Sequence, residues 1–125
     1  MTDSKLIDSS AWLSYFYAEN PKIKSIVESD EILLTSALAI YEVKLKLLKD
    51  KKEPSLIQKS LDIIKKRSLI LSIDEKISGD ASEISFKHTL HMADALIYVS
   101  AVRNNALLIT LDNDFRGLSN VFILD

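Results

Sequence analysis

The segment Lys5-Leu6-Ile7-Asp8-Ser9-Ser10 combines three structural signals in a short space. An apolar run of strand length ends in an acid, and serines that can cap a helix follow directly. Apolar side chains then recur at helical spacing as far as Asn20-Pro21, where a helix is expected to stop. This order predicts a buried strand, an acid at its carboxyl end, and a helix capped by Ser9 or Ser10.

The same alternation continues along the rest of the chain. Further apolar runs of strand length occupy 31–35, 68–73, 106–111 and 121–124. Helices are expected to begin at Pro21, at Thr35 or Ser36, at Pro54, after Asp74, and near Met92. Strands and helices that alternate with short connections predict an α/β fold on a parallel sheet, with right-handed crossovers. We expect residues 1–125 to form one three-layer domain.

Composition excludes several kinds of functional site. The chain of 125 residues has no cysteine, so disulfides, thiol nucleophiles and thiolate metal sites are excluded. Its two glycines, Gly79 and Gly117, lie too far apart for a phosphate-binding loop or a dinucleotide fingerprint. The formal net charge of −2 provides no overall attraction for nucleic acid, so a polyanionic substrate has to be held by local features.

Targeting and membrane signals are also missing from the sequence pattern. Residues 1–13 do not combine a basic stretch with a long apolar run, and no window approaches the roughly 20 apolar residues of a membrane span. We expect a soluble cytoplasmic protein with no membrane partner.

Four acids occupy positions that matter for chemistry. Asp8 and Asp112 each end an apolar run, and the carboxyl ends of parallel strands form the usual ligand-binding edge of an open α/β sheet. Asp94 begins a helix that is apolar on nearly every side, and Glu42 borders an apolar stripe of its own helix. We therefore expect these carboxylates to face a common pocket.

Each acid also has a purely structural interpretation. Asp8 can be only a helix cap, and Asp94 only an acid favoured by the dipole of its helix. Glu42 can pair with Lys46 one helical turn later, and Asp112 and Asp114 can be turn residues. Converging carboxylates would repel one another and raise their pKa values, so a shared pocket requires a cation. Oxygen ligands without sulfur favour Mg²⁺ or Mn²⁺.

At these residues the chain resembles the PIN-domain family, particularly the VapC-type ribonuclease toxins of prokaryotic toxin–antitoxin modules. The matching blocks are Leu6-Ile7-Asp8-Ser9-Ser10, Ile40-Tyr41-Glu42, Ala93-Asp94-Ala95-Leu96-Ile97 and Thr110-Leu111-Asp112-Asn113-Asp114-Phe115. Each block is weak alone, but their order and spacing make the match fairly specific, and the resemblance covers essentially the whole chain.

The resemblance implies an α/β/α sandwich around a five-stranded parallel sheet in the order 3-2-1-4-5. It implies that Asp8, Glu42, Asp94 and Asp112 bind Mg²⁺ or Mn²⁺ and catalyse hydrolysis of RNA, including structured RNA such as tRNA. It gives Asp114, Thr110 and Ser9 supporting roles. It also implies neutralisation by a cognate antitoxin protein, and homodimers are common in the family.

The mechanism expected for such a site is metal-assisted hydrolysis without a covalent intermediate. The leading alternative is a non-catalytic PIN-like module that binds protein or RNA through its surface. A receiver-type phosphoacceptor domain is disfavoured, because the sequence lacks the adjacent acid pair and the late lysine that such a domain requires.

Two further clusters suggest binding surfaces. Lysines at 44, 46, 49, 51 and 52, together with Lys65-Lys66-Arg67, form either solvated faces or a track for an RNA backbone. Trp12, Tyr15, Phe16 and Tyr17 fall within six residues, a span that covers every side of a helix. They cannot all face one core, so some are expected at a surface or interface; in the resembling toxins this region helps to receive the antitoxin.

Two apparent metal motifs are rejected. Asp112-x-Asp114-x-x-Gly117 begins like an EF-hand loop, but Arg116 and Ile123 occupy positions that require oxygen ligands. His88 and His91 lack a third nitrogen or sulfur ligand nearby in the sequence, and we expect them on the surface or at a pocket rim.

Overall fold

A computed structural model of the chain describes residues 4–125. The strands are β1 (Ser4–Ile7), β2 (Ile32–Ser36), β3 (Leu69–Leu71), β4 (Leu107–Thr110) and β5 (Val121–Ile123). The helices are α1 (Ser9–Phe16), α2 (Pro21–Val27), α3 (Ala37–Lys49), α4 (Pro54–Arg67), α5 (Glu75–His88) and α6 (Met92–Arg103), with a short 3₁₀ helix, η1 (Asn113–Phe115). The predicted elements are present, although the predicted run 68–73 shortens to the three-residue strand β3. Within this part of the chain no helix has the length and apolar character needed to cross a membrane.

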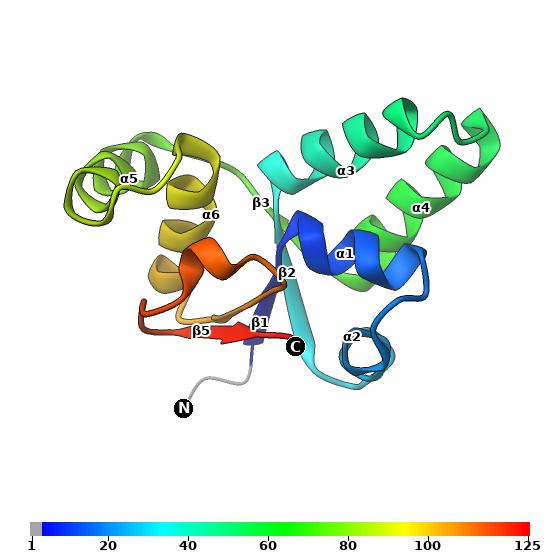
Figure 1. Cartoon of the computed structure of the whole chain (residues 1–125), viewed down its shortest axis with the longest axis horizontal. Helices are drawn as coiled ribbons and strands as arrows, with labels where there is room; N and C mark the ends of the chain where they lie inside the picture. Colours follow the sequence, from blue (N-terminus) through cyan, green and yellow to red (C-terminus); the bar gives the residue numbers. More distant parts are fainter. Residues whose placement is uncertain (1–3) are drawn as a thin grey trace.

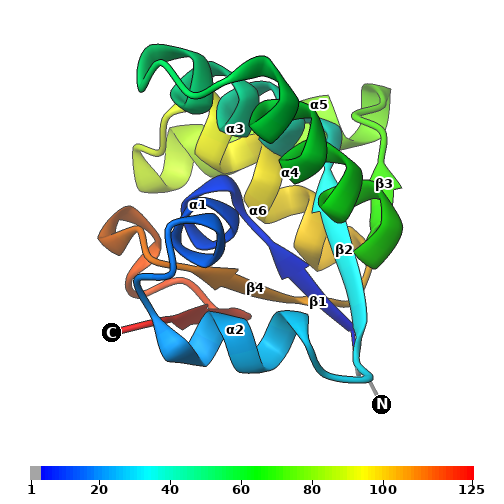
Figure 2. The same ribbon diagram turned by 90° about the vertical axis from the view of Figure 1, so that its right-hand side faces the viewer.

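The strands form one parallel sheet in the order β3-β2-β1-β4-β5, which confirms the predicted fold class. β1 is central, and its Leu6 lies opposite Leu34 of β2 and Leu108 of β4. Helices α5 and α6 cover one face of the sheet and α1 to α4 cover the other (Figure 1). In the perpendicular view α1, α2 and α4 lie in front of the sheet and α6 lies behind it (Figure 2).

Alternation of side chains along the strands explains the two cores. In β1, Leu6 packs on the α5–α6 side and Ile7 on the opposite side, and both are fully buried. Leu108 and Ile109 of β4 divide in the same way. Burial of one such side chain contributes about 1.5–3 kcal/mol, so a shift of register by one residue would be strongly disfavoured.

Helix caps fix where the chain leaves the carboxyl edge of the sheet. Ser36 caps α3 by accepting a hydrogen bond from the Leu38 amide. At α1, however, the predicted serine caps are wrong. Asp8 accepts the Ala11 amide at 2.9 Å, so the helix begins at Ser9. The hydroxyls of Ser9 and Ser10 are therefore available for contacts with other side chains.

Candidate metal centre

Three carboxylates lie closest together at the carboxyl edge of the sheet. Asp94, Asp112 and Asp114 each offer an oxygen, and these oxygens lie within 4.8 Å of one another. Asp94 stands in the first turn of α6, while Asp112 follows β4 and caps η1 by accepting the Asp114 amide at 2.9 Å. This cap turns the chain so that the two acids after β4 face the start of α6.

The electrostatics of this triad show that its charge is not balanced. The pKa of Asp94 is raised to about 6, chiefly by burial and then by the nearby charges of Asp112, Asp114 and Glu42, while His91 opposes the rise. Among residues 4–125 neither a lysine nor an arginine forms an ion pair with any of these acids. A site with several oxygen donors and no paired cation fits a hard divalent ion such as Mg²⁺ or Mn²⁺.

Asp8 lies beside the triad in a different environment. Asp8 is only 4% exposed, and burial is the largest cause of a net rise of its pKa to about 6. Hydrogen bonds from Thr110, the Ala11 amide and Ser10 lower this pKa, and the charge of Asp112 raises it. Asp8 therefore caps α1, as its structural interpretation supposed, and it is also electrostatically coupled to the acids after β4.

Glu42 projects from α3 toward the start of α1. Its Oε1 accepts a hydrogen bond of 3.0 Å from the hydroxyl of Ser9. The alternative pairing with Lys46 is wrong, because Lys46 instead contacts Asp50 at 3.2 Å. The charge of Glu42 also raises the pKa of Asp94, so Glu42 contributes to the negative charge at the carboxyl edge of the sheet.

The sequence-predicted residues thus separate into two groups. Asp94 and Asp112 belong to the close triad, together with Asp114, which we expected only in a supporting role. Asp8 and Glu42 lie outside that triad and are held by hydroxyl groups. Thr110 donates to Asp8, and Ser9 donates to Glu42.

Ser10 was missed as a site residue. Its hydroxyl donates to Asp8 Oδ1 at 2.7 Å. The signal in the sequence is local, because Ser10 follows Asp8 by two residues and can reach its side chain at the start of the helix.

The basic clusters are only partly available to a ligand. Lys44, Lys49, Lys51, Lys65 and Lys66 are exposed. Lys52 lies 5.0 Å from the centre of the Tyr17 ring. Arg67 differs from its predicted surface role, because it donates to the main-chain oxygens of Val27, Ser29 and Glu31. Arg67 therefore holds the end of α2 against the start of β2.

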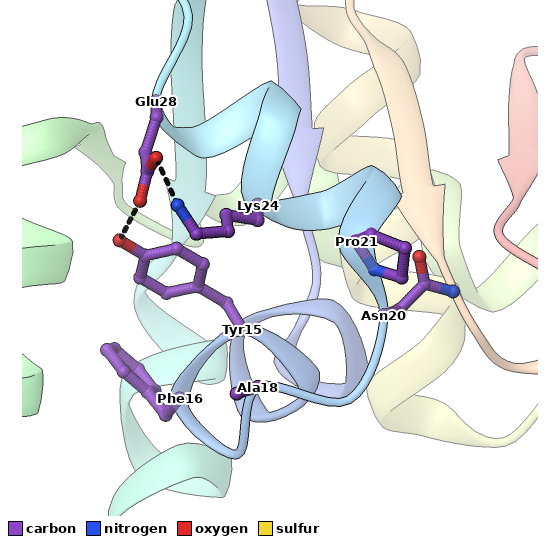
Figure 3. A pocket seen from close by; sticks show the side chains of 7 residues that line it. All are labelled: Tyr15, Phe16, Ala18, Asn20, Pro21, Lys24 and Glu28. Carbon is purple, nitrogen blue, oxygen red and sulfur yellow. Dashed lines mark hydrogen bonds and ion pairs between the residues drawn. The ribbon is translucent and has the colours of Figure 1, made fainter.

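A second concave feature lies between α1 and α2. Its volume is about 430 Å³, and its lining residues are Tyr15, Phe16, Ala18, Asn20, Pro21, Lys24 and Glu28. Tyr15 and Lys24 both point to the carboxylate of Glu28 (Figure 3). Trp12 is fully buried, whereas Tyr15, Phe16 and Tyr17 are half-buried. The aromatic cluster is therefore divided between core and surface, as the helical span predicted.

The two histidines lie on the surface. His88 ends α5 and His91 is the cap residue before α6, and both are exposed. His91 lowers the pKa of Asp94, which places it at the rim of the acidic centre.

Comparison with solved structures places this geometry among known proteins. A toxin–antitoxin complex from Klebsiella pneumoniae matches with a TM-score of 0.79 and 20% identity over 97% of this chain and 98% of that one. VapBC2 from Rickettsia felis, bound to a DNA fragment from its promoter, matches with a TM-score of 0.81 and 19% identity over 98% and 99%. VapC20 from Mycobacterium tuberculosis, described as a toxin that cleaves the Sarcin-Ricin loop, matches with a TM-score of 0.74 and 14% identity over 91% and 94%.

These likenesses establish the fold. A search of curated proteins found no match. The family model of the PIN domain matches residues 5–120, so the chain belongs to the PIN domain family.

Proposed function

We propose that this protein is a Mg²⁺- or Mn²⁺-dependent endoribonuclease that acts as the VapC-type toxin of a toxin–antitoxin module. The observation that carries the proposal is the triad of Asp94, Asp112 and Asp114, whose charge is not compensated by a lysine or arginine within residues 4–125. Membership of the PIN domain family supports nuclease chemistry at this edge. The structural neighbours described as toxin–antitoxin complexes support the biological role.

In this proposal, different residues of the chain bind the metal ion and orient the attacking water. Asp94, Asp112 and Asp114 would hold the ion, and we assign Asp8 to the same ligand set, although it lies outside the close triad. Glu42, fixed by Ser9, either completes the ligand set or accepts a hydrogen bond from the attacking water. When bound, the ion would lower the pKa of a water molecule and stabilise charge that develops on the phosphodiester.

The raised pKa values of Asp8 and Asp94 agree with such a role. Both stand at about 6 without a cation, so a divalent ion would favour their ionised forms and displace protons. We expect metal affinity to fall as the pH is lowered through this range.

For partners, we propose RNA as substrate, tRNA included, a cognate antitoxin and a second copy of the chain. The pocket between α1 and α2 is the surface we assign to the antitoxin, because it combines aromatic walls with a polar edge at Glu28. The exposed lysines between 44 and 66 are the surface we assign to the RNA backbone. We propose that a single nuclease domain, residues 1–125, carries out these functions in the cytoplasm.

The test is RNA cleavage by purified wild-type protein beside Asp94→Asn. We expect cleavage in Mg²⁺, its loss in EDTA, and its loss in the variant. If Asp94→Asn cleaves RNA at the wild-type rate, the proposed site is wrong. If neither protein cleaves RNA or binds Mn²⁺, while the antitoxin is still bound, the non-catalytic binding module is favoured instead.

A further inference from the structure

The hydroxyl of Ser10 joins two segments that are distant in the sequence. It donates to Asp8 Oδ1 at 2.7 Å and accepts the Leu111 amide at 3.0 Å. The hydroxyl thus donates its only proton to Asp8, while its oxygen accepts a hydrogen bond from the connection after β4. This arrangement ties the start of α1 directly to the chain that carries Asp112 and Asp114.

Thr110 forms a second, parallel bridge. Its hydroxyl donates to Asp8 Oδ2 and accepts the Asp112 amide at 2.9 Å. The hydroxyl oxygens of Ser10 and Thr110 lie 3.4 Å apart. Two hydroxyls, one at the start of α1 and one at the end of β4, therefore hold both oxygens of the Asp8 carboxylate.

Counting acceptor positions shows what these bridges leave open. A carboxylate has about four lone-pair positions, two on each oxygen. Asp8 Oδ1 accepts two hydrogen bonds, from Ser10 and the Ala11 amide, while Oδ2 accepts one, from Thr110. These three hydrogen bonds fix the orientation of the carboxylate before any ligand binds. They leave one lone-pair position, on Oδ2, for a ligand.

The two hydroxyls also affect the position of the triad, through the main chain that follows β4. Ser10 and Thr110 together fix the amides of Leu111 and Asp112, and Asp112 in turn caps η1 through the Asp114 amide. The direction of this turn decides where two of the three close carboxylates lie relative to Asp94. Loss of the Ser10 hydroxyl would leave the Leu111 amide without this partner and Asp8 Oδ1 with one hydrogen bond fewer.

We propose that Ser10 is a positioning residue that sets the metal affinity of the centre, acting through Asp8 and the Leu111 amide. The inference rests on the proposed function, and it assigns to Ser10 a task that its neighbour Ser9 does not share. Ser9 donates to Glu42 and makes no contact with the connection after β4 among its hydrogen bonds in the described chain.

The experiment compares Ser10→Ala, Ser10→Thr and Ser60→Ala with wild type. Ser60 is a matched control, because its buried hydroxyl donates only to a carbonyl of its own helix, α4, at 3.0 Å. Mn²⁺ affinity is measured by electron paramagnetic resonance, and protection of the Leu111 amide is measured by hydrogen exchange. Removal of a group that orients a ligand typically weakens metal binding by about 10- to 100-fold.

We expect Ser10→Ala to weaken Mn²⁺ binding about tenfold and to speed exchange at Leu111, with kcat lowered more than KM is changed. Ser10→Thr restores the hydroxyl and should recover both readouts, whereas Ser60→Ala should retain wild-type values. Ser9→Ala should leave exchange at Leu111 unchanged.

Wild-type Mn²⁺ affinity in Ser10→Ala would overturn the inference, as would a Ser10→Thr variant that fails to recover although it folds. A wild-type protein that binds Mn²⁺ but leaves RNA intact would contradict the proposed function alone, because the variants' metal affinities still report on Ser10. A wild-type protein that binds no Mn²⁺ would overturn both.

Discussion

The acidic centre and the pocket between α1 and α2 shift the pKa values of their carboxylates in opposite directions. In the pocket, Glu28 accepts Lys24 Nζ at 2.7 Å and the Tyr15 hydroxyl at 3.3 Å, and the hydrogen bond from Lys24 is the main reason its pKa is lowered. At the centre, burial and neighbouring acids raise the pKa of Asp94 to about 6. The pocket balances its charge internally, whereas no lysine or arginine within residues 4–125 pairs with the acids of the centre.

This difference in charge indicates which kind of ligand each region can bind. The pocket has an apolar cavity and a neutralised edge, so it suits a partner that inserts a side chain. The centre concentrates negative charge where helices and strands converge, so it suits a cation and, through it, a phosphate. Variants that separate charge from shape can therefore break or sharpen the contrast.

The largest effect is expected from removing one charge at the centre. Asp112→Asn keeps the size of the side chain but removes a candidate ligand, and RNA cleavage in Mg²⁺ should fall by at least about 100-fold. Glu28→Gln removes one charge from the pocket and should cleave RNA at the wild-type rate. Equal losses in the two variants would show that charge at the centre has no special role.

A smaller effect is expected from removing an aromatic wall of the pocket. Phe16 lines the cavity and stacks on the buried Trp12, with ring centres 5.9 Å apart. Phe16→Ala should weaken antitoxin binding by about 10- to 100-fold, as loss of an anchoring side chain does at interfaces, and should leave metal binding intact. Calorimetry with the purified antitoxin measures the change.

The matched control for this variant is Phe86→Ala. Phe86 is 90% exposed on α5, outside the pocket. If Phe86→Ala weakens antitoxin binding as much as Phe16→Ala does, the antitoxin surface has been assigned to the wrong face.

The smallest effect is a dependence of stability on pH in the metal-free protein. Asp8 and Asp94 have pKa values of about 6 when folded, against a reference of 3.8, so the folded state binds more protons between these values. Stability should therefore fall as the pH rises from about 4 to about 6 and then level off, because the unfolded carboxylates ionise first. Glu28, with its lowered pKa, contributes in the opposite direction.

Scanning calorimetry at pH 5 and pH 7 measures this dependence. We expect a melting temperature a few degrees higher at pH 5 in EDTA, and a smaller or reversed difference in Mg²⁺. The same pH dependence with and without Mg²⁺ would mean that the ion does not act on these carboxylates.

The sequence predicted much of the fold because its signals are local. Strand-length apolar runs at Leu6 and Leu108 and capping residues such as Ser36 and Asp74 report on neighbouring positions. The acids that end strands could also be placed, since parallel strands bring their carboxyl ends to one edge.

Contacts between distant segments could not be predicted in the same way. The Ser10 hydroxyl meets an amide 101 residues away, and Arg67 meets carbonyls about 40 residues away, so neither contact leaves a local pattern. The rotation of α3 that turns Glu42 toward Ser9 depends on packing of the whole helix. The close approach of Asp114 depends on the η1 turn, and the sequence indicates a turn at Asp112 and Asp114 only as one of two interpretations.

The central claim is that Asp94, Asp112 and Asp114 form a divalent metal site. Isothermal titration calorimetry of Mg²⁺ and Mn²⁺ into wild type and Asp94→Asn, each in metal-free buffer at pH 7.5, tests it most directly. We expect saturable binding to wild type and at least tenfold weaker binding to the variant, together with proton release on binding. Equal affinity in the two proteins, or no binding to a folded wild-type protein, would contradict the claim.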